Sequence, residues 1–218
     1  MTRQALIFAN GEIDDGPTVD RALAMGENAL HIAADGGLRV ARHYGVSLDL
    51  IIGDMDSVTE SDLRLLATAG VRIERFPPEK NETDLELALL WAAEQGVQWI
   101  RIIGGLGGRL DQTLSNIYLL ALPALRDRDV ALVANRHETR LLLPGETSIH
   151  GAEGDTVSLI PVSGVARRIR TTGLYYPLND EDLLFGPARG VSNVMTADKA
   201  TVTFTEGVLL LVHTLGKA

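Results

Sequence analysis

The sequence is organised around one short stretch, Leu50-Ile51-Ile52-Gly53-Asp54-Met55-Asp56-Ser57. Its three apolar residues are typical of the end of a buried strand, and a glycine then leads into two aspartates one residue apart. If the backbone stays extended, Asp54 and Asp56 point to the same side, with Cα atoms about 7 Å apart. Two ionised carboxylates about 6 Å apart repel by roughly 3 kcal/mol at an effective dielectric of about 20. The stretch is therefore either a polar turn or a site for a hard cation such as Mg²⁺, and alone it leaves both interpretations open.

Along the first ~140 residues, short apolar runs alternate with longer stretches of helical periodicity. Strands are expected at 4–9, 29–34, 50–53, 71–76, 99–103, 130–133 and 139–143. The clearest helix is expected at 82–95, and another at about 111–122. Strands that alternate with helices predict right-handed βαβ units and a mainly parallel sheet. The strands are apolar throughout, as burial on both faces of such a sheet requires.

The pattern changes after Pro144-Gly145. From there to Ala218 no amphipathic helix is expected, and short strand-like runs recur at 156–161, 165–170, 199–205 and 208–213. Such runs, separated by turns, predict a small antiparallel sandwich or barrel. The sequence thus predicts an α/β N-terminal domain with a mainly parallel sheet over residues 1–143, followed by a small all-β sandwich domain over residues 144–218.

The composition of the 218 residues excludes several classes of function. There is no cysteine, which rules out disulfides, thiolate zinc sites and a cysteine nucleophile. The formal net charge of −9 argues against a nucleic-acid-binding surface, although a bound cation would still permit a nucleotide ligand. No signal peptide is recognised and no apolar run approaches the roughly 20 residues that span a bilayer, so we expect a soluble cytoplasmic protein with no membrane partner.

Four acidic or glycine-rich segments follow predicted strands, at the edge where parallel sheets bind ligands. They are Asp35-Gly36-Gly37, the stretch with Asp54 and Asp56, Lys80-Asn81-Glu82-Thr83-Asp84, and Gly104-Gly105-Leu106-Gly107-Gly108-Arg109-Leu110-Asp111. Each has an ordinary explanation, because Asp-Gly-Gly is a common turn and Thr83, Asp84 or Asp111 could cap a helix. Acidic loops repeated at one edge of a sheet, however, concentrate charge that needs a cation. Together the four segments favour a metal site.

The glycine-rich segment suits the phosphate groups of a nucleotide. Glycine amides approach phosphate oxygens without interference from a Cβ, and the N-terminus of the following helix adds partial positive charge. Arg109 and Lys80 add two donors for phosphate, whereas the spacing excludes a Walker A loop. With carboxylates for Mg²⁺ and no evident covalent nucleophile, the sequence predicts a site for Mg²⁺ and a nucleoside triphosphate that works by positioning and charge stabilisation.

These motifs together resemble the thiamine pyrophosphokinase (thiamine diphosphokinase) family. The resemblance is carried, in this order, by Ala34-Asp35-Gly36-Gly37, Ile52-Gly53-Asp54-Met55-Asp56-Ser57, Lys80-Asn81-Glu82-Thr83-Asp84 and Gly107-Gly108-Arg109-Leu110-Asp111-Gln112-Thr113-Leu114. Two further segments, Thr172-Gly173-Leu174-Tyr175-Tyr176-Pro177-Leu178 and Arg189-Gly190-Val191-Ser192-Asn193, resemble segments of the family's thiamine-binding domain. The similarity covers nearly the whole chain, and its motifs are specific as an ordered set.

The resemblance implies an α/β nucleotide-binding catalytic domain and a β-sandwich thiamine-binding domain. It also implies Mg²⁺-dependent transfer of diphosphate from ATP to the hydroxyl of thiamine, giving thiamine diphosphate and AMP, in a homodimer with thiamine bound near the subunit interface. By match to the motifs, Asp54, Asp56 and Asp84 would be Mg²⁺ ligands or the general base, and Asp35 would orient the site. Asp111, like Arg109 and Lys80, would handle the phosphates and substrate. Either Asp84 or Asp111 could accept the hydroxyl proton, and the sequence does not choose between them.

The resemblance also assigns residues to the two substrates. The phosphates and the rest of the nucleotide would be held by Gly36, Lys80, Thr83, Gly107, Gly108, Arg109 and Gln112, and thiamine by Ser192 and Asn193. The sequence departs from the family pattern in two places. Gln112 stands where His is usual, and after Asn193, where many bacterial members have Glu, this chain has Val194 and then Met195. The second departure leaves the contacts to thiamine less defined than the phosphate site.

Two other hypotheses stay open from the residues alone. The first is a different Mg²⁺-dependent nucleotide phosphotransferase or phosphohydrolase, because an Asp-x-Asp at a strand end serves many such reactions. The second is a non-catalytic nucleotide or thiamine sensor. Formation of AMP from ATP and thiamine separates both from a diphosphokinase.

Overall fold

The computed structural model describes residues 3–217, and the chain forms two compact units. The N-terminal unit ends at Asn135 and the C-terminal unit begins at Arg136. The division therefore lies before the strand His137–Leu142, whereas the domain boundary predicted from the sequence lies after it. Among the described residues, no helix is long and apolar enough to cross a membrane.

The N-terminal unit is built on a parallel sheet with the strand order β6-β5-β1-β2-β3-β4. Its strands are β1 (Gln4–Phe8), β2 (Leu30–Ala34), β3 (Leu50–Gly53), β4 (Arg72–Arg75), β5 (Trp99–Ile103) and β6 (Asp129–Ala134). The connecting helices are α1 (Pro17–Met25), α2 (Gly37–His43), α3 (Glu60–Thr68), α4 (Asp84–Glu94) and α5 (Leu110–Leu119), with a 3₁₀ turn, η1, at Pro123–Leu125. The strand order reverses between β1 and β5, which makes this a doubly wound sheet.

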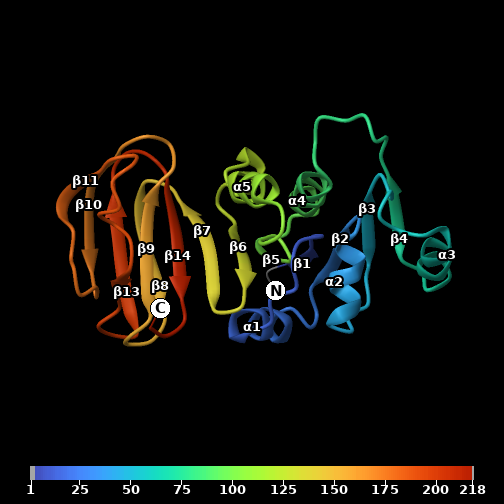
Figure 1. The fold of residues 1–218 in the computed structure, drawn as a ribbon, viewed down its shortest axis with the longest axis horizontal. Helices are drawn as coiled ribbons and strands as arrows, with labels where there is room; N and C mark the ends of the chain where they lie inside the picture. Colours follow the sequence, from blue (N-terminus) through green and yellow to red (C-terminus); the bar gives the residue numbers. More distant parts are fainter. Residues whose placement is uncertain (1–2, 218) are drawn as a thin grey trace. The chain divides into compact units, whose positions relative to one another are not determined.

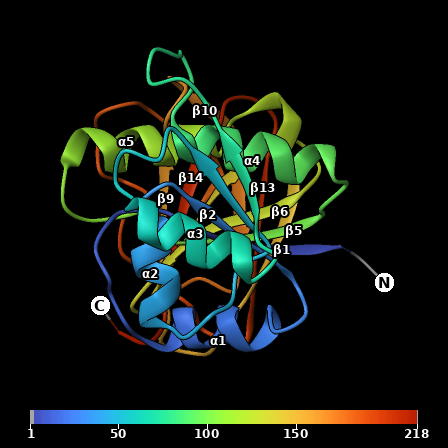
Figure 2. The same cartoon turned by 90° about the vertical axis from the view of Figure 1, so that its right-hand side faces the viewer.

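Helices cover both faces of this sheet (Figures 1 and 2). The helices α4 and α5 lie along one face and α1 and α2 along the other. Burial on both faces explains why the central strands are continuous apolar runs: Leu6, Ile7 and Phe8 of β1 are all fully buried. The edge strand β4 differs, because its sequence Arg-Ile-Glu-Arg leaves charged side chains on the free edge.

The C-terminal unit contains two antiparallel sheets, with the orders β12-β9-β14-β7 and β11-β10-β13-β8. Their strands are β7 (His137–Leu142), β8 (Gly145–His150), β9 (Thr156–Pro161), β10 (Ala166–Thr172), β11 (Asn179–Leu183), β12 (Asn193–Val194), β13 (Lys199–Phe204) and β14 (Leu209–Thr214). One apolar core takes Val157 and Leu159 from the first sheet and Ile169, Val202 and Phe204 from the second. The predicted fold class, an α/β unit followed by a β-sandwich, is confirmed.

Three of these strands, β8, β11 and β12, are absent from the sequence-based prediction. The reason is clearest for β11, whose sequence Asn-Asp-Glu-Asp-Leu has low strand propensity. It pairs with the arginine-rich strand β10, where Arg167 lies 3.0 Å from Asp182 and Arg168 lies 3.2 Å from Asp180. Opposite charges across the two strands thus support a strand that propensity alone does not predict.

The C-terminal unit also holds a buried pair of ionisable side chains. Asp155 and His213 are only 4% and 6% exposed, and His213 Nε2 lies 2.9 Å from a carboxylate oxygen of Asp155. The same carboxylate accepts hydrogen bonds from the backbone N–H groups of Ala152 and Gly216. Burial acts to raise the pKa of Asp155, but these donors outweigh it and hold the pKa below its usual range.

We expect Asp155→Asn to destabilise the protein by about 3 kcal/mol, because the amide replaces a buried, ionised acceptor of three hydrogen bonds. Folding lowers the pKa of Asp155, so its ionised carboxylate stabilises the unsubstituted protein. This stabilisation is fully present above the ordinary aspartate pKa of 3.8 and is lost as the pH falls through the lowered pKa. Urea denaturation at a series of pH values measures both effects. The exposed Asp198→Asn is the control, and equal stability of the two variants at pH 7 would contradict the expectation.

Candidate active site

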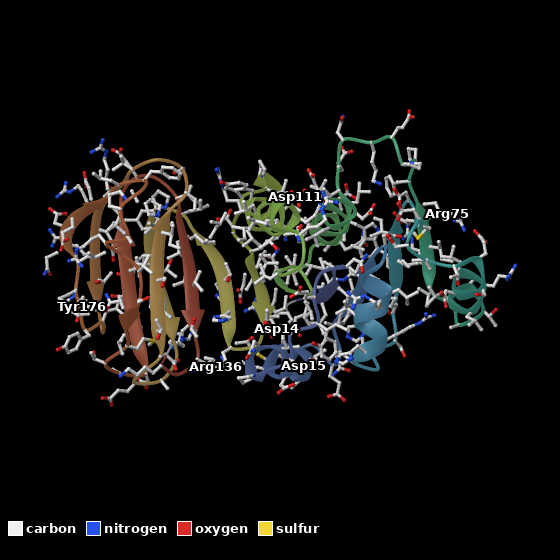
Figure 3. All side chains as sticks on the ribbon, in the orientation of Figure 1. Asp14, Asp15, Arg75, Asp111, Arg136 and Tyr176 are labelled. Carbon is white, nitrogen blue, oxygen red and sulfur yellow. The ribbon has the colours of Figure 1, made fainter. Side chains whose placement is uncertain are left out.

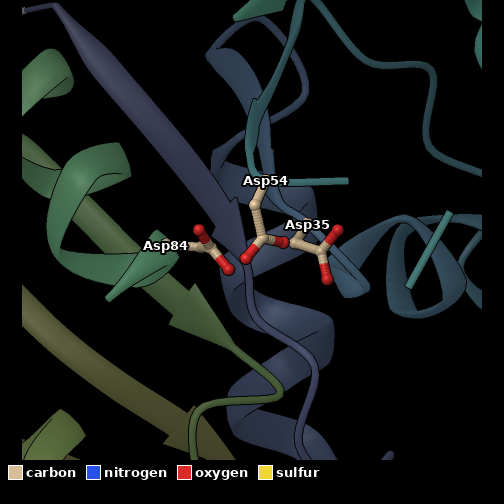
Figure 4. Close-up of side chains that lie close together, drawn as sticks. All are labelled: Asp35, Asp54 and Asp84. Carbon is tan, nitrogen blue, oxygen red and sulfur yellow. The ribbon is translucent and has the colours of Figure 1, made fainter. Parts of the chain in front are cut away.

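Three aspartates meet at the carboxyl end of the parallel sheet (Figure 4). Asp35 follows β2, Asp54 follows β3, and Asp84 is the first residue of α4. One carboxylate oxygen from each lies within 4.8 Å of the other two. Adjacent parallel strands end at the same edge, so the loops that follow them converge there. We call Asp35, Asp54 and Asp84 the acidic cluster.

Glycine is required at the end of β3 because the cluster packs against it. A Cβ on Gly53 would lie 2.9 Å from the carboxyl carbon of Asp84 and 3.0 Å from the Cβ of Asp35. The backbone of Gly53 also has a φ of 147°, which L side chains rarely adopt. The small residue at this position therefore lets two acidic side chains approach the strand end closely.

The two aspartates of the central stretch do not lie as an extended backbone would place them. Met55, between them, has a φ of 65°, so the chain turns in the left-handed region instead of continuing the strand. Asp54 joins the acidic cluster, and its carboxylate also accepts a hydrogen bond from the backbone N–H of Asp56. The carboxylate of Asp56 lies outside the cluster and accepts a hydrogen bond from the Ser57 hydroxyl. The pair thus does not have the side-by-side geometry of an extended backbone.

The acidic cluster leaves buried oxygen atoms without hydrogen bonds. Among the described residues, Asp35 Oδ1 and Asp84 Oδ1 are buried and have no hydrogen-bond partner. Lys80 Nζ lies 3.0 Å from Asp84 Oδ1 and 3.6 Å from Asp54 Oδ2, distances of an ion pair but without hydrogen-bonding geometry. Buried carboxylate oxygens normally have a partner, so Asp35 Oδ1 indicates a missing ligand. Three hard oxygen donors in this arrangement fit a divalent cation such as Mg²⁺.

The electrostatics of the cluster follow from burial and from its one close ammonium group. Burial raises the pKa of Asp84, and the negative charges of Asp54 and Asp35 add to this effect, while Lys80 opposes it. Burial acts to lower the pKa of Lys80, but Asp84 and Asp54 outweigh it and hold that pKa above its usual value. The cluster therefore carries excess negative charge that its single lysine only partly offsets.

The glycine-rich loop lies between β5 and α5, at the same edge of the sheet. Gly107 has a φ of 84°, and a Cβ there would lie 2.7 Å from a carboxylate oxygen of Glu12. The loop is held from α5 by Asn116, whose side-chain amide donates to the carbonyl oxygen of Gly105 at 2.8 Å. Its backbone is thus fixed in a conformation that presents amide groups without side chains.

One cleft of about 860 Å³ joins the acidic cluster and the glycine-rich loop. The sequence-predicted residues that line it are Asp35, Asp56, Lys80, Thr83, Asp84, Gly107, Gly108, Arg109 and Gln112. Two others, Gly36 and Asp54, lie beside lining residues without lining the cleft themselves. Thr83 also caps α4, because its hydroxyl accepts from the backbone N–H of Glu86. The structure thus brings most of the predicted phosphate-site residues together within the N-terminal unit.

Asp111, labelled in Figure 3, is not among the residues that line this cleft. It is exposed on the first turn of α5 and pairs with Arg109 through two contacts, of 3.1 Å and 2.5 Å. The Arg109 guanidinium holds the pKa of Asp111 below its usual range. Arg109 lines the cleft and Asp111 does not, so Asp111 acts on the cleft through its contacts with Arg109.

The lining residues that the sequence analysis missed include Asn10, Gly11, Glu12, Arg39 and Asn116. Asn10, Gly11 and Glu12 follow β1, so the rule that located the other loops would have found them had it been applied to the first strand. Arg39 and Asn116 lie inside helices and carry no sequence signal of this kind. Arg39 donates to the carbonyl oxygen of Gly11 at 2.6 Å and so fixes this segment.

The two residues assigned to thiamine lie in the C-terminal unit and differ in exposure. Ser192 is exposed and has a φ of 58°. Asn193 is 9% exposed, and its side chain is occupied by the protein itself, because it accepts from the N–H groups of Tyr176 and Val194 and donates to the carbonyl of Tyr176. Tyr176 projects outward, 58% exposed, in an edge-to-face pair with Tyr175 (Figure 3). Asn193 thus holds an exposed aromatic pair.

Comparison with known proteins gives the same family for both units. The family model of the thiamin pyrophosphokinase catalytic domain matches residues 22–132, and that of the thiamin pyrophosphokinase vitamin B1 binding domain matches residues 146–209. The chain is 32% identical over 188 residues to thiamine pyrophosphokinase of Bacillus subtilis, which covers 86% of this chain and 88% of that protein.

Solved structures agree with the sequence comparison. The crystal structure of thiamine pyrophosphokinase from Bacillus subtilis aligns with a TM-score of 0.83 at 29% identity, covering 98% of this chain and 99% of the other. That from Geobacillus thermodenitrificans aligns with a TM-score of 0.82 at 29% identity, covering 97% of each chain. Yeast thiamin pyrophosphokinase aligns with a TM-score of 0.81 at 17% identity, covering 98% of this chain and 86% of the other. At this identity the alignment supports the assignment of the fold alone. The chain therefore belongs to the thiamine pyrophosphokinase family.

Proposed function

We propose that the chain is a Mg²⁺-dependent thiamine diphosphokinase, which transfers the diphosphate of ATP to the hydroxyl of thiamine and releases AMP. The observation that carries the proposal is one cleft that is lined by Asp35 and Asp84 of the acidic cluster and also by the glycine-rich loop. Hard oxygen ligands next to backbone amides that can reach phosphate are what a metal–polyphosphate ligand requires. Membership of the family supplies thiamine as the acceptor.

In this proposal the acidic cluster holds the cation, which when bound neutralises negative charge on the polyphosphate. Asp56 lines the same cleft and is proposed as a further ligand once the polyphosphate is present. Gly107, Gly108 and Arg109 contact phosphate oxygens from the other side. The chain thus contributes positioning and fixed charge, which is the main work of catalysis in phosphoryl transfer.

Of the two candidate bases, Asp84 suits the hydroxyl proton better than Asp111. A proton acceptor works best when its pKa is not far below the working pH. Arg109 lowers the pKa of Asp111, and burial raises that of Asp84. We therefore favour Asp84 over Asp111 as the proton acceptor, and assign Asp111 to the orientation of Arg109.

The remaining assignments concern thiamine, assembly and location. We propose that thiamine is held by Ser192 and by the aromatic pair that Asn193 positions, in a homodimer acting in the cytoplasm, where ATP is available. An exposed apolar stripe on α5 supports the dimer: Leu110, Leu114 and Tyr118 are 72%, 48% and 60% exposed at successive turns of one helix face.

We expect Asp54→Asn to lower the rate of AMP formation from ATP and thiamine by about 10³-fold or more, because one charged ligand of the cation is lost. Asp56→Asn, measured in parallel, tests the further ligand, and near-normal turnover would remove Asp56 from the metal site. The exposed Asp20→Asn, on α1, serves as the control. Release of inorganic phosphate without AMP would instead identify a different phosphotransferase or phosphohydrolase.

Removal of divalent cations is the second test. We expect a chelator to abolish AMP formation, because without a divalent cation the acidic cluster lacks its counter-charge. We expect added Mg²⁺ to restore AMP formation. Mg²⁺ at about 100 times its dissociation constant should also stabilise the folded protein by about 2.7 kcal/mol, measured by thermal unfolding without substrates. Sodium chloride at equal ionic strength is the control. Full turnover in the presence of the chelator would rule out the metal-dependent mechanism.

A further inference from the structure

Lys80 lies in the loop between β4 and α4 and reaches into the acidic cluster. Its side chain is 10% exposed, and its ammonium nitrogen lies 3.0 Å from Asp84 and 3.6 Å from Asp54. Residues four apart often form ion pairs on one face of a helix, and Lys80 precedes Asp84 by four residues. Here α4 begins only at Asp84, so Lys80 lies outside the helix and the contact is not of that kind. The loop itself therefore brings the ammonium to the cluster.

No other cation of the cleft does this among the residues that the structure describes. The further cationic side chains that line the cleft are Arg39 and Arg109. Arg39 donates to the carbonyl oxygen of Gly11, and Arg109 is 72% exposed and paired with Asp111. Among the lining cations of the described residues, Lys80 is thus the one that contacts two carboxylates of the acidic cluster, Asp54 and Asp84.

One ammonium does not complete this site. With Lys80 present, the three ionised carboxylates still carry two unbalanced negative charges, and Asp35 Oδ1 remains buried without a hydrogen-bond partner. A divalent cation supplies the missing charge and the missing partner, but it must approach the same two carboxylates, Asp54 and Asp84, that Lys80 contacts. Two cations so close to one another repel, and the desolvated setting strengthens the repulsion.

We propose that Lys80 is the resident counter-ion of the acidic cluster and competes with the divalent cation for Asp54 and Asp84, so that tight metal binding requires a polyphosphate to draw the ammonium away. The proposal rests on the proposed function, because the polyphosphate is that of its nucleotide. A lysine suits this role, since its ammonium is a point charge on a flexible stem that can move from a carboxylate to a phosphate oxygen.

The competition makes the binding of metal and polyphosphate cooperative. Without the polyphosphate, Lys80 stabilises the cluster and weakens metal binding. With it, one movement of Lys80 frees two carboxylates for the cation and places a positive charge on the phosphates. A purely structural salt bridge would behave differently, because its removal would destabilise the protein without strengthening metal binding.

The test uses Lys80→Met in the full-length protein, with Arg109→Met as the matched control, since it removes a positive charge from the same cleft but not from the cluster. Binding of Mn²⁺ alone, as a spectroscopic probe for the divalent cation, is measured at constant pH by the electron paramagnetic resonance signal of free Mn²⁺. We expect Lys80→Met to bind Mn²⁺ about tenfold more tightly or better than the unsubstituted protein, and Arg109→Met to bind it within about threefold. Equal Mn²⁺ affinity of Lys80→Met and the unsubstituted protein would overturn the proposal.

A second measurement on the unsubstituted protein does not depend on the folding of any variant. We expect a non-hydrolysable ATP analogue to increase the affinity for Mn²⁺ after correction for Mn²⁺ bound by the free analogue, and to do so less in Lys80→Met. An analogue that leaves the corrected affinity of the unsubstituted protein unchanged would contradict the proposal. Thiamine-dependent AMP formation is assayed on the same preparations. If Lys80 competes with Mn²⁺ but no AMP forms, only the proposed function is refuted. If AMP forms but Lys80 does not compete with Mn²⁺, only the role of Lys80 is refuted.

Discussion

The mutual repulsion of three carboxylates at the ends of neighbouring strands is the constraint on which the site depends. Oxygens of Asp35, Asp54 and Asp84 lie within 4.8 Å of one another, and two unit charges at that distance repel by about 3 kcal/mol at an effective dielectric of about 20. A flexible surface would separate them. The cluster exists because buried strands and a helix N-terminus hold each aspartate, and because Lys80 supplies part of the opposing charge.

The sheet provides the rigidity that this repulsion demands. The strands that precede Asp35 and Asp54 end in buried residues on both faces, so their ends cannot move apart without opening the core. Gly53 completes the arrangement, since a side chain there would occupy the space of Asp84 and Asp35. The same edge carries the glycine-rich loop, so one sheet positions both the oxygen ligands and the amide donors.

Charge has a different role in the C-terminal unit. There Asp155 is fully satisfied by two backbone donors and His213, whereas Asp35 of the acidic cluster keeps an oxygen without a partner. A satisfied buried carboxylate stabilises the fold, and an unsatisfied one indicates a ligand. The contrast separates a structural aspartate from a functional one within one chain, although sequence context presents both simply as acidic residues next to turns.

The sequence by itself determined the order of the elements, the change from βαβ units to a β-sandwich, and the acidic and glycine-rich loops, because apolar periodicity and strand-end position are local properties. Only the tertiary structure decided which acids meet. Asp35 and Asp54 join Asp84 while Asp56 turns away, because Met55 leaves the extended region. The contribution of Arg39 and Asn116 to the cleft, and the strand formed by the acidic residues of β11, likewise come from contacts between distant segments. Such contacts depend on how packed strands and helices bring loops together, which no local pattern encodes.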